Sequence, residues 1–139
     1  MALTIDEMQR ILVEAFPGND VPEVRSANDD SIVLCLPVTD RHGRPGGTVS
    51  GPTLMMLADT AAWLAILYHI GPVLLAVTTS LHIDFLRKPA IADVCARTRL
   101  LKLGRRLAVV DIDIFSEGSH DLAAKAQVTY SIPPGDRPA

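Results

Sequence analysis

The segment from Gly46 to Pro72, GGTVSGPTLMMLADTAAWLAILYHIGP, constrains the fold more than any other part of the chain. Between positions 52 and 70 it is almost entirely apolar, with Pro52 at one end and Gly71-Pro72 at the other, as is typical of the first turn and the end of a helix. A helix that is apolar on nearly all sides must also be covered on nearly all sides. One carboxylate, Asp59, lies near its middle.

A transmembrane span is the first alternative, because about 19 apolar residues approach the length that crosses a bilayer. An ionised aspartate at mid-bilayer would cost about 2.5 to 3.5 kcal/mol on insertion scales. The flanks also show no marked excess of Lys or Arg on one side. We therefore expect a buried core helix and no membrane partner.

The sequence period changes from helical to alternating after Leu74. Residues 74–88, 93–103, 105–116 and 122–132 have the alternation of strands, with turn residues between them at hairpin spacing. Residues 31–38 form a further strand after a polar loop, and residues 4–16 have helical spacing with Thr4 and Glu7 as a capping box. We predict an α+β fold in which an antiparallel meander curls around the long central helix, with an additional N-terminal helix at its edge.

Composition narrows the function classes. The 139 residues carry 13 Lys and Arg against 16 Asp and Glu, so the chain lacks the basic balance of a nucleic-acid-binding protein. Acids at Asp6 and Glu7 replace the basic start of a signal peptide, which predicts a cytoplasmic protein. We expect a single domain over 1–139, with its core at about 31–132 and a loose tail at 133–139.

The remaining reactive residue types do not form a site of their own. Cys35 and Cys95 lie in apolar runs and are expected to be unpaired core thiols, with no disulfide framework. The histidines are scattered, and His82 with Asp84 offers too few ligands for a metal, so no metal is expected. No Gly-x-Ser-x-Gly motif is present, which sets aside hydrolases of the nucleophile-elbow type.

Asp59 is either satisfied by a structural neighbour, exposed by helix rotation, or held in a pocket for chemistry, because aspartate is almost never fully buried without a partner. The residues three and four positions away offer it no charge: Met55, Met56, Ala62 and Trp63. The glycine segment before the helix adds a second candidate group, since free N–H groups at a helix N-terminus can polarise an oxygen that gains negative charge.

Asp59 and Gly51 cannot reach one carbonyl group from the same helix, because eight residues at about 1.5 Å each separate them by roughly 12 Å along the axis. If the two residues act together, two helices must run antiparallel across a two-fold axis. The Gly51 N–H of one chain then faces Asp59 of the other. This geometry predicts an obligate homodimer with two sites at its interface.

The order of these motifs resembles one known family. The stretches GGTVSGPTLMMLADTAA, VTTSLHIDFLRKPA, KLGRRLAVVDIDIF and LAAKAQVTY are similar to the hotdog-fold acyl-CoA thioesterases of the phenylacetyl-CoA (PaaI-like) group, over roughly residues 31–132. The resemblance implies hydrolysis of an acyl-CoA thioester without a further cofactor, in homodimers that pair into a tetramer. It assigns activation of water or attack on the thioester to Asp59, polarisation of the carbonyl to the Gly51 N–H, and positioning of water to Thr78, with Thr79 less favoured.

Candidates for substrate binding fall into two groups. One group lies at the start of the long helix or on it, where acyl-pocket lining and helix core are the alternatives: Ser50, Pro52, Met55 and Trp63. The other consists of basic residues at turns, for which contact with the phosphates of coenzyme A and solvated hairpin charge are the alternatives: Arg87, Lys88 and Arg105.

The chain departs from the family's usual loop, which reads Asn, Gly and then His-Gly-Gly before the helix. Arg44 stands at the Asn position, and Ser50-Gly51-Pro52 replaces His-Gly-Gly. Because Pro52 has no N–H, only Gly51 can donate there. A non-catalytic protein that binds or senses acyl-CoA is the alternative function. Hydratases of the same fold are set aside, because Leu64 stands where a His follows their Asp.

Overall fold

The computed structural model describes residues 2–18 and 20–134, so most of the predicted loose tail, 135–139, lies outside the described residues. Its central element is α2 (Gly51–Ile70). Ser50 caps this helix, since its Oγ accepts the Thr53 N–H at 3.3 Å. Gly71, with a φ of 91°, ends it and donates its N–H to the Leu67 carbonyl.

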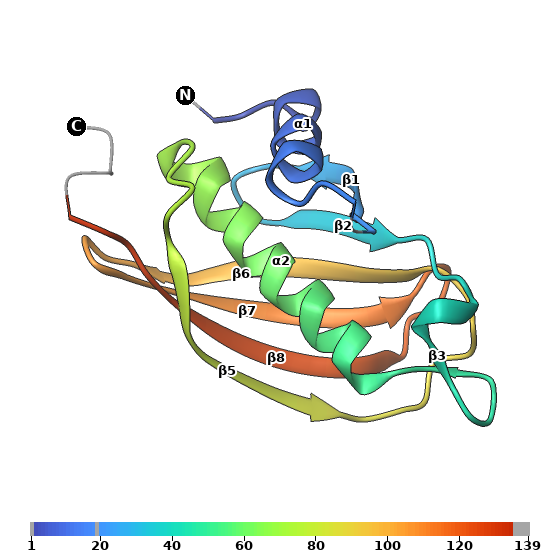
Figure 1. Ribbon diagram of the computed structural model, residues 1–139. Helices are drawn as coiled ribbons and strands as arrows, with labels where there is room; N and C mark the ends of the chain where they lie inside the picture. Colours follow the sequence, from blue (N-terminus) through green and yellow to red (C-terminus); the bar gives the residue numbers. More distant parts are fainter. Residues whose placement is uncertain (1, 19, 135–139) are drawn as a thin grey trace.

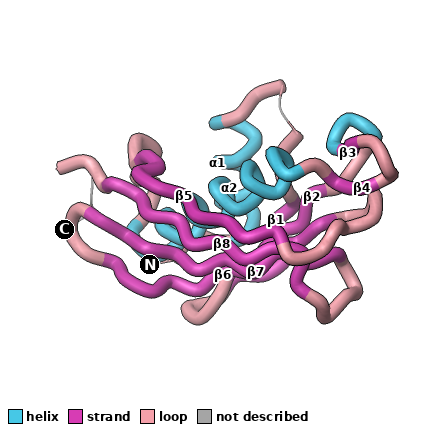
Figure 2. Tube along the Cα trace, turned by 90° about the horizontal axis from the view of Figure 1, so that it is seen from below, coloured by secondary structure: helices cyan, strands magenta, loops and turns pink. Residues whose placement is uncertain are grey.

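Six antiparallel strands form one sheet in the order β1-β2-β6-β7-β8-β5. Their bounds are β1 (Glu23–Ala27), β2 (Ile32–Leu36), β5 (Val77–Phe85), β6 (Val94–Leu103), β7 (Leu107–Ser116) and β8 (Leu122–Ser131). The sheet curls around α2 (Figure 1, Figure 2). Alternate side chains of β7 are buried against the helix, as a period of two requires: Ala108, Val110, Ile112 and Ile114.

The apolar character of α2 is explained by this enclosure. By length and composition α2 could cross a membrane, but 67% of its most apolar window is buried inside the protein. The predicted core helix and the sheet around it are confirmed. A curled antiparallel sheet around one long helix, with an additional N-terminal helix, is the hotdog fold.

The sequence prediction of the sheet is wrong in two places. The segment before residue 31 is not only a polar loop, because it contains β1, whose single buried side chain, Val24, gives too weak an apolar signal. In addition, β5 pairs with β8 and not with β6, so the meander covers β6, β7 and β8 alone. The turn residues at 88–90 therefore belong to a crossover, and turn chemistry alone cannot identify the strand that follows as a neighbour.

The N-terminal helix α1 (Ile5–Ala15) has the predicted capping box between Thr4 and Glu7. It packs beside β1 at the edge of the sheet, where Met8 and Leu12 are buried. The Gln9 side chain joins helix to strand, because it donates to the Pro22 carbonyl at 3.0 Å and accepts the Val24 N–H at 2.8 Å.

The glycine-rich loop between β2 and α2 has structure of its own. It contains a 3-10 turn, η1 (Asp40–His42), and a small hairpin of β3 (Gly43–Arg44) and β4 (Thr48–Val49). Gly46 and Gly47, with φ of 99° and 73°, turn this hairpin. The Val49 N–H also bonds the Pro89 carbonyl at 3.0 Å, which ties the loop to the residues after β5.

The expectation of unpaired cysteines is wrong, because Cys35 and Cys95 form a disulfide. The two residues lie directly opposite each other in the β2–β6 ladder, with their Cα atoms 4.0 Å apart. Both are buried. The sequence did not indicate this pairing, because the two cysteines are 60 residues apart and meet only through the register of β2 and β6, which are not consecutive strands.

Candidate active site

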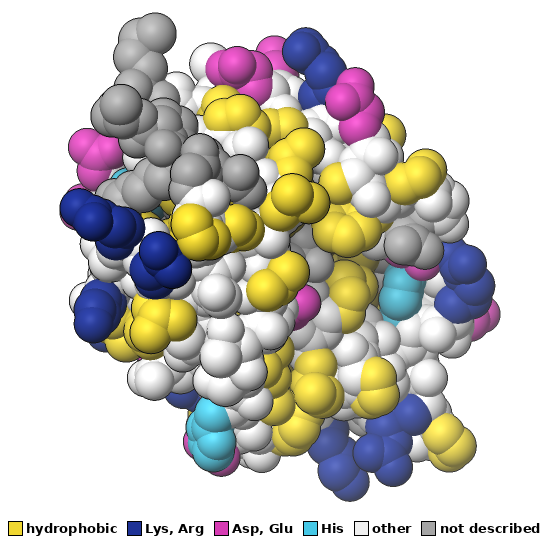
Figure 3. Space-filling model, turned by 60° about the vertical axis from the view of Figure 1, so that its left-hand side comes forward, with side chains coloured by type: hydrophobic (Ala, Val, Ile, Leu, Met, Phe, Trp, Pro, Cys, Tyr) yellow, Lys and Arg dark blue, Asp and Glu magenta, His cyan; other side chains and the backbone are white. Residues whose placement is uncertain are grey.

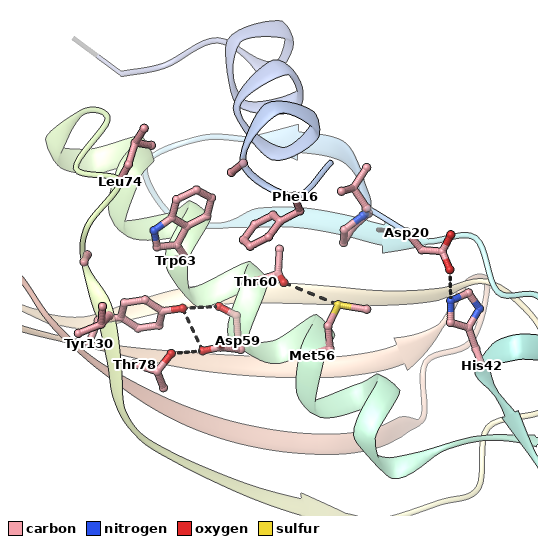
Figure 4. A pocket seen from close by; sticks show the side chains of 15 residues that line it. Phe16, Asp20, His42, Met56, Asp59, Thr60, Trp63, Leu74, Thr78 and Tyr130 are labelled. Atoms are coloured by element: carbon pink, nitrogen blue, oxygen red, sulfur yellow. Dashed lines mark hydrogen bonds and ion pairs between the residues drawn. The ribbon is translucent and has the colours of Figure 1, made fainter. Parts of the chain in front are cut away.

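A pocket of about 870 Å³ lies beside the middle of α2, on the side where α1 ends and β5 begins (Figure 4). Its α2 wall includes Asp59 and Trp63. Phe16, at the end of α1, packs edge to face on Trp63 with ring centroids 5.6 Å apart. The pocket therefore places one carboxylate beside an apolar, partly aromatic wall.

Asp59 is held through one of its two carboxylate oxygens. Thr78 donates its hydroxyl to Asp59 Oδ1 at 2.6 Å. Tyr130 donates its hydroxyl to the same Oδ1 at 2.9 Å and also lies 3.0 Å from the Asp59 carbonyl oxygen. Within the described part of the chain, no cation contacts Asp59 and its Oδ2 has no hydrogen-bond donor. The half-buried carboxylate is thus fixed at Oδ1, and Oδ2 is left for another partner.

Tyr130 was missed by the sequence analysis, where it counted only as part of the last strand. It is buried at an inward position of β8. Burial raises the pKa of the Tyr130 phenol well above its usual range, and the neighbouring Asp59 carboxylate contributes in the same direction. The phenol therefore stays protonated and acts as a donor to Asp59. A hydroxyl group in an otherwise apolar alternation is the one signal that the sequence offered.

Gly51 begins α2 and offers a free donor. Two of the other N–H groups in the first turn of α2 are bonded to Ser50: its Oγ accepts the Thr53 N–H, and its carbonyl accepts the Leu54 N–H at 3.3 Å. Pro52 has no N–H. Across residues 2–18 and 20–134, no acceptor contacts the Gly51 N–H. Gly51 does not line the pocket of its own chain, so one chain alone does not bring this N–H to Asp59.

Of the residues predicted for substrate binding, one lines the pocket of this chain and the others do not. Trp63 lines the pocket. Arg87 donates to the Leu122 carbonyl at 2.8 Å, next to a turn at the surface. The rest lie outside the pocket lining of this chain, at the helix start, on its exposed side, on β5 or at surface turns: Ser50, Pro52, Met55, Thr79, Lys88 and Arg105.

The opposite end of the pocket holds a second polar pair that the sequence analysis did not identify. His42 Nε2 lies 2.9 Å from Asp20 Oδ2, and both residues line the pocket (Figure 4). His42 is buried despite its place in a glycine-rich loop. The two residues come from separate loops, so no local motif indicated the pair.

The described residues contain no candidate metal site, because no group of three or more His, Cys, Asp or Glu side chains is arranged so that it could hold an ion. His82 and Asp84, the one pair considered from sequence, form an exposed ion pair at 3.1 Å. In the main pocket, Asp59 lies apart from the Asp20–His42 pair.

The edge strand β5 leaves an apolar surface uncovered. Val77, Phe85 and Leu86 are 59%, 51% and 52% exposed, and Met55 on α2 is 41% exposed. Figure 3 shows hydrophobic side chains gathered around a hollow on one face of the molecule. A strand edge with free backbone groups and apolar side chains is suited to pairing with another chain.

Comparison with known proteins agrees with this architecture. The sequence profile described as "Thioesterase superfamily" matches residues 46–123, more than half of the chain. The chain belongs to the thioesterase superfamily. It is 30% identical to the Pseudomonas aeruginosa protein named "Putative esterase PA0474", over 73% of this chain and 75% of that one.

Solved structures give the same result. A protein of Silicibacter sp. TM1040, titled a "putative thioesterase", is 44% identical with a TM-score of 0.86, covering 95% of this chain and 93% of that one. Zebra fish thioesterase superfamily member 2 is 25% identical with a TM-score of 0.81, covering 95% and 100%. The hotdog fold predicted from the sequence is therefore shared with thioesterases.

Proposed function

We propose that this protein hydrolyses an acyl-CoA thioester to a free acid and coenzyme A, at a site shared by two subunits of a homodimer. The observation that carries the proposal is the arrangement of Asp59, whose Oδ1 is held by Thr78 and Tyr130 while no described residue donates to Oδ2, beside the apolar wall of the pocket. Membership of the thioesterase superfamily supports the reaction class.

In the reaction, Asp59 Oδ2 either takes a proton from a water that attacks the thioester carbonyl carbon or attacks that carbon itself. The carbon–sulfur bond then breaks, and the thiolate of coenzyme A leaves and takes up a proton. If Asp59 attacks, water cleaves the resulting anhydride and regenerates the carboxylate. Thr78 can serve as the water-positioning group, since its oxygen retains lone pairs after it donates to Asp59.

The partner chain supplies the second half of the site. Gly51 has a free N–H but lies roughly 12 Å along the helix from Asp59 of its own chain. A two-fold related copy, docked on the apolar β5 edge, would place its Gly51 N–H against the thioester carbonyl. The exposed bases at surface turns, Arg87, Lys88 and Arg105, would meet the phosphates of coenzyme A. Pairing of two dimers and a cytoplasmic location complete the proposal.

Thiol release from a panel of short aliphatic and aryl CoA thioesters tests the activity. Asp59→Asn should lose most turnover while it remains a folded dimer, because the amide cannot accept a proton or attack. Equal turnover in this variant would remove Asp59 from the mechanism. Absence of turnover across the whole panel for the unmodified chain would reject the enzyme itself.

Mixing two inactive variants tests whether the site is shared. Asp59→Asn and Gly51→Pro each damage a different half of the site. In a mixed dimer, one site regains Asp59 from one chain and Gly51 from the other, so statistical exchange of subunits should restore about a quarter of the original activity. Each variant incubated alone is the control. Failure of the mixture to regain activity, with subunit exchange demonstrated, would contradict a site built from Asp59 of one chain and Gly51 of the other.

A non-catalytic acyl-CoA binding protein is the second candidate. This alternative is supported by the loop before α2, which departs from the usual loop of the family. Arg44 is exposed there, and the Ser50 hydroxyl caps α2. Calorimetry with the same esters distinguishes the two functions. Tight binding without release of thiol would favour binding alone.

A further inference from the structure

The His42 ring is bound by the protein on both of its nitrogens. His42 is 7% exposed. Its Nδ1 accepts the backbone N–H of Thr39 at 2.9 Å, and its Nε2 lies 2.9 Å from Asp20 Oδ2. Because Nδ1 acts as an acceptor, Nε2 carries the hydrogen of the neutral ring and donates it to Asp20. The contacts therefore define both the orientation of the ring and its tautomer.

This arrangement favours a structural task for His42 over proton exchange with a substrate. A histidine that passes protons to a substrate needs a nitrogen that faces it, and both nitrogens of His42 are occupied. Among the residues that the structure describes, Asp20 also contacts the Arg41 guanidinium, and the Asp20 side chain is itself 39% exposed. His42 is thus the buried member of this small network.

The His42 backbone connects this pair to the start of α2. The His42 carbonyl accepts the Ser50 N–H at 2.8 Å, and Ser50 immediately precedes Gly51. The β3–β4 hairpin closes the chain between the two hydrogen-bonded residues. The Ser50 N–H belongs to the Val49–Ser50 peptide, directly before the peptide that carries the Gly51 N–H. A shift of His42 would therefore move Ser50 and, through it, change the direction of the Gly51 N–H.

We infer that Asp20 and His42 are positioning residues that fix the Ser50–Gly51 peptide, so that the Gly51 N–H points to the place of the thioester carbonyl oxygen. The inference rests on the proposed function of Gly51. It also explains how a loop with Arg44, Ser50 and Pro52 can still present its donor. Asp20, which lies between α1 and β1, holds the loop through His42.

Amide hydrogen exchange measured by nuclear magnetic resonance, combined with steady-state kinetics, tests this role. In Asp20→Ala and His42→Phe, exchange at the Ser50 N–H should accelerate by about tenfold or more as the segment loosens. In both variants kcat should fall by about tenfold or more, with KM within about threefold, because a donor misplaced by a fraction of an ångström loses its effect in the transition state.

Two further variants keep the result specific. Asp20→Asn retains an oxygen that can accept from His42 Nε2, so it should recover most of the rate lost in Asp20→Ala. Asp40→Asn, an exposed neighbour on the same turn as His42, should leave exchange and kcat unchanged. Thermal melting followed by circular dichroism shows whether each variant is folded. If His42→Phe does not fold, Asp20→Ala still tests the inference, because it changes only a partly exposed side chain.

The outcomes separate the positioning role from the proposed function. Unchanged protection of the Ser50 N–H in folded Asp20→Ala would overturn the inference. Loss of that protection with unchanged kcat would overturn it as well. A wild-type chain without turnover would reject the thioesterase proposal, whereas exchange at the Ser50 N–H would still show whether Asp20 and His42 hold the segment that leads into Gly51.

Discussion

Thr78 and Tyr130 face each other in the β5–β8 ladder and donate their hydroxyls to the same oxygen, Asp59 Oδ1. The edge strand β5 and its neighbour β8 thus both bond to α2 at one atom. Two donors on one oxygen orient the carboxylate and leave Oδ2 as the oxygen to which the proposed function assigns the chemistry. Pairing of the last strand with the strand after α2 is therefore part of the candidate active site as well as of the fold.

The two hydroxyl donors should be energetically coupled. Tyr130→Phe and Thr78→Val each remove one hydrogen bond to a charged group, which contributes about 1.5 to 3 kcal/mol, so each should lower kcat by about tenfold or more. A double-mutant cycle measured by thiol release should give a non-additive loss, because both hydroxyls act on the same carboxylate oxygen. Strictly additive losses would show that the two hydroxyls act on different steps. Circular dichroism provides the folding control.

Gly51→Pro should remove the proposed oxyanion donor with little change to the backbone. Proline is tolerated at the first position of a helix, and Ser50, with ψ of 152°, already has the conformation that precedes proline. Loss of one such donor typically costs about 2.7 to 4 kcal/mol, so kcat should fall by roughly one hundred- to one thousandfold.

Gly51→Ala is the matched control for this variant. It keeps the N–H, and its added Cβ would lie 3.4 Å from Phe85 Cζ, an ordinary contact. It should fold and retain the N–H contribution to kcat. If both variants lost activity equally, the effect would come from the size of the side chain and not from the donor.

The stability difference between the wild-type chain and Tyr130→Phe should depend on pH above about pH 10. Burial raises the pKa of the Tyr130 phenol in the folded state, whereas the unfolded phenol titrates near 10. The unfolded chain then loses this proton first, so the wild type loses stability relative to Tyr130→Phe by about 1.4 kcal/mol per pH unit in that range. Urea unfolding at pH 7, 9 and 11 measures the difference. A constant difference would contradict the buried phenol.

The disulfide should contribute measurably to stability. It closes a loop with a sequence separation of 60 residues, for which the chain-entropy relation gives about 4 kcal/mol. The double variant Cys35→Ala/Cys95→Ala should therefore unfold at a lower urea concentration than the oxidised wild type. Thiol titration of the unfolded, unreduced wild type should find no free thiol. Two titratable thiols would contradict the bond.

Local sequence patterns were sufficient for α2, α1 and five of the strands, because α2 is apolar on nearly all sides and the other elements have apolar periods of their own. The same reasoning singled out Asp59, and the family resemblance added Thr78; these two residues are in direct contact. The contacts that escaped prediction depend on register between distant segments. The Asp20–His42 pair and the Tyr130 contact with Asp59 join residues that no periodicity relates.

The enclosure of α2 has a consequence for the order in which the chain is made. Only β1 and β2 of the surrounding sheet precede the helix in synthesis, while β5, β6, β7 and β8 follow it. The growing chain thus carries a bare apolar helix until its last strands arrive, a condition that favours capture by chaperones. Because Tyr130 lies in β8 and donates to Asp59 Oδ1, the carboxylate acquires this contact only after β8 has been made.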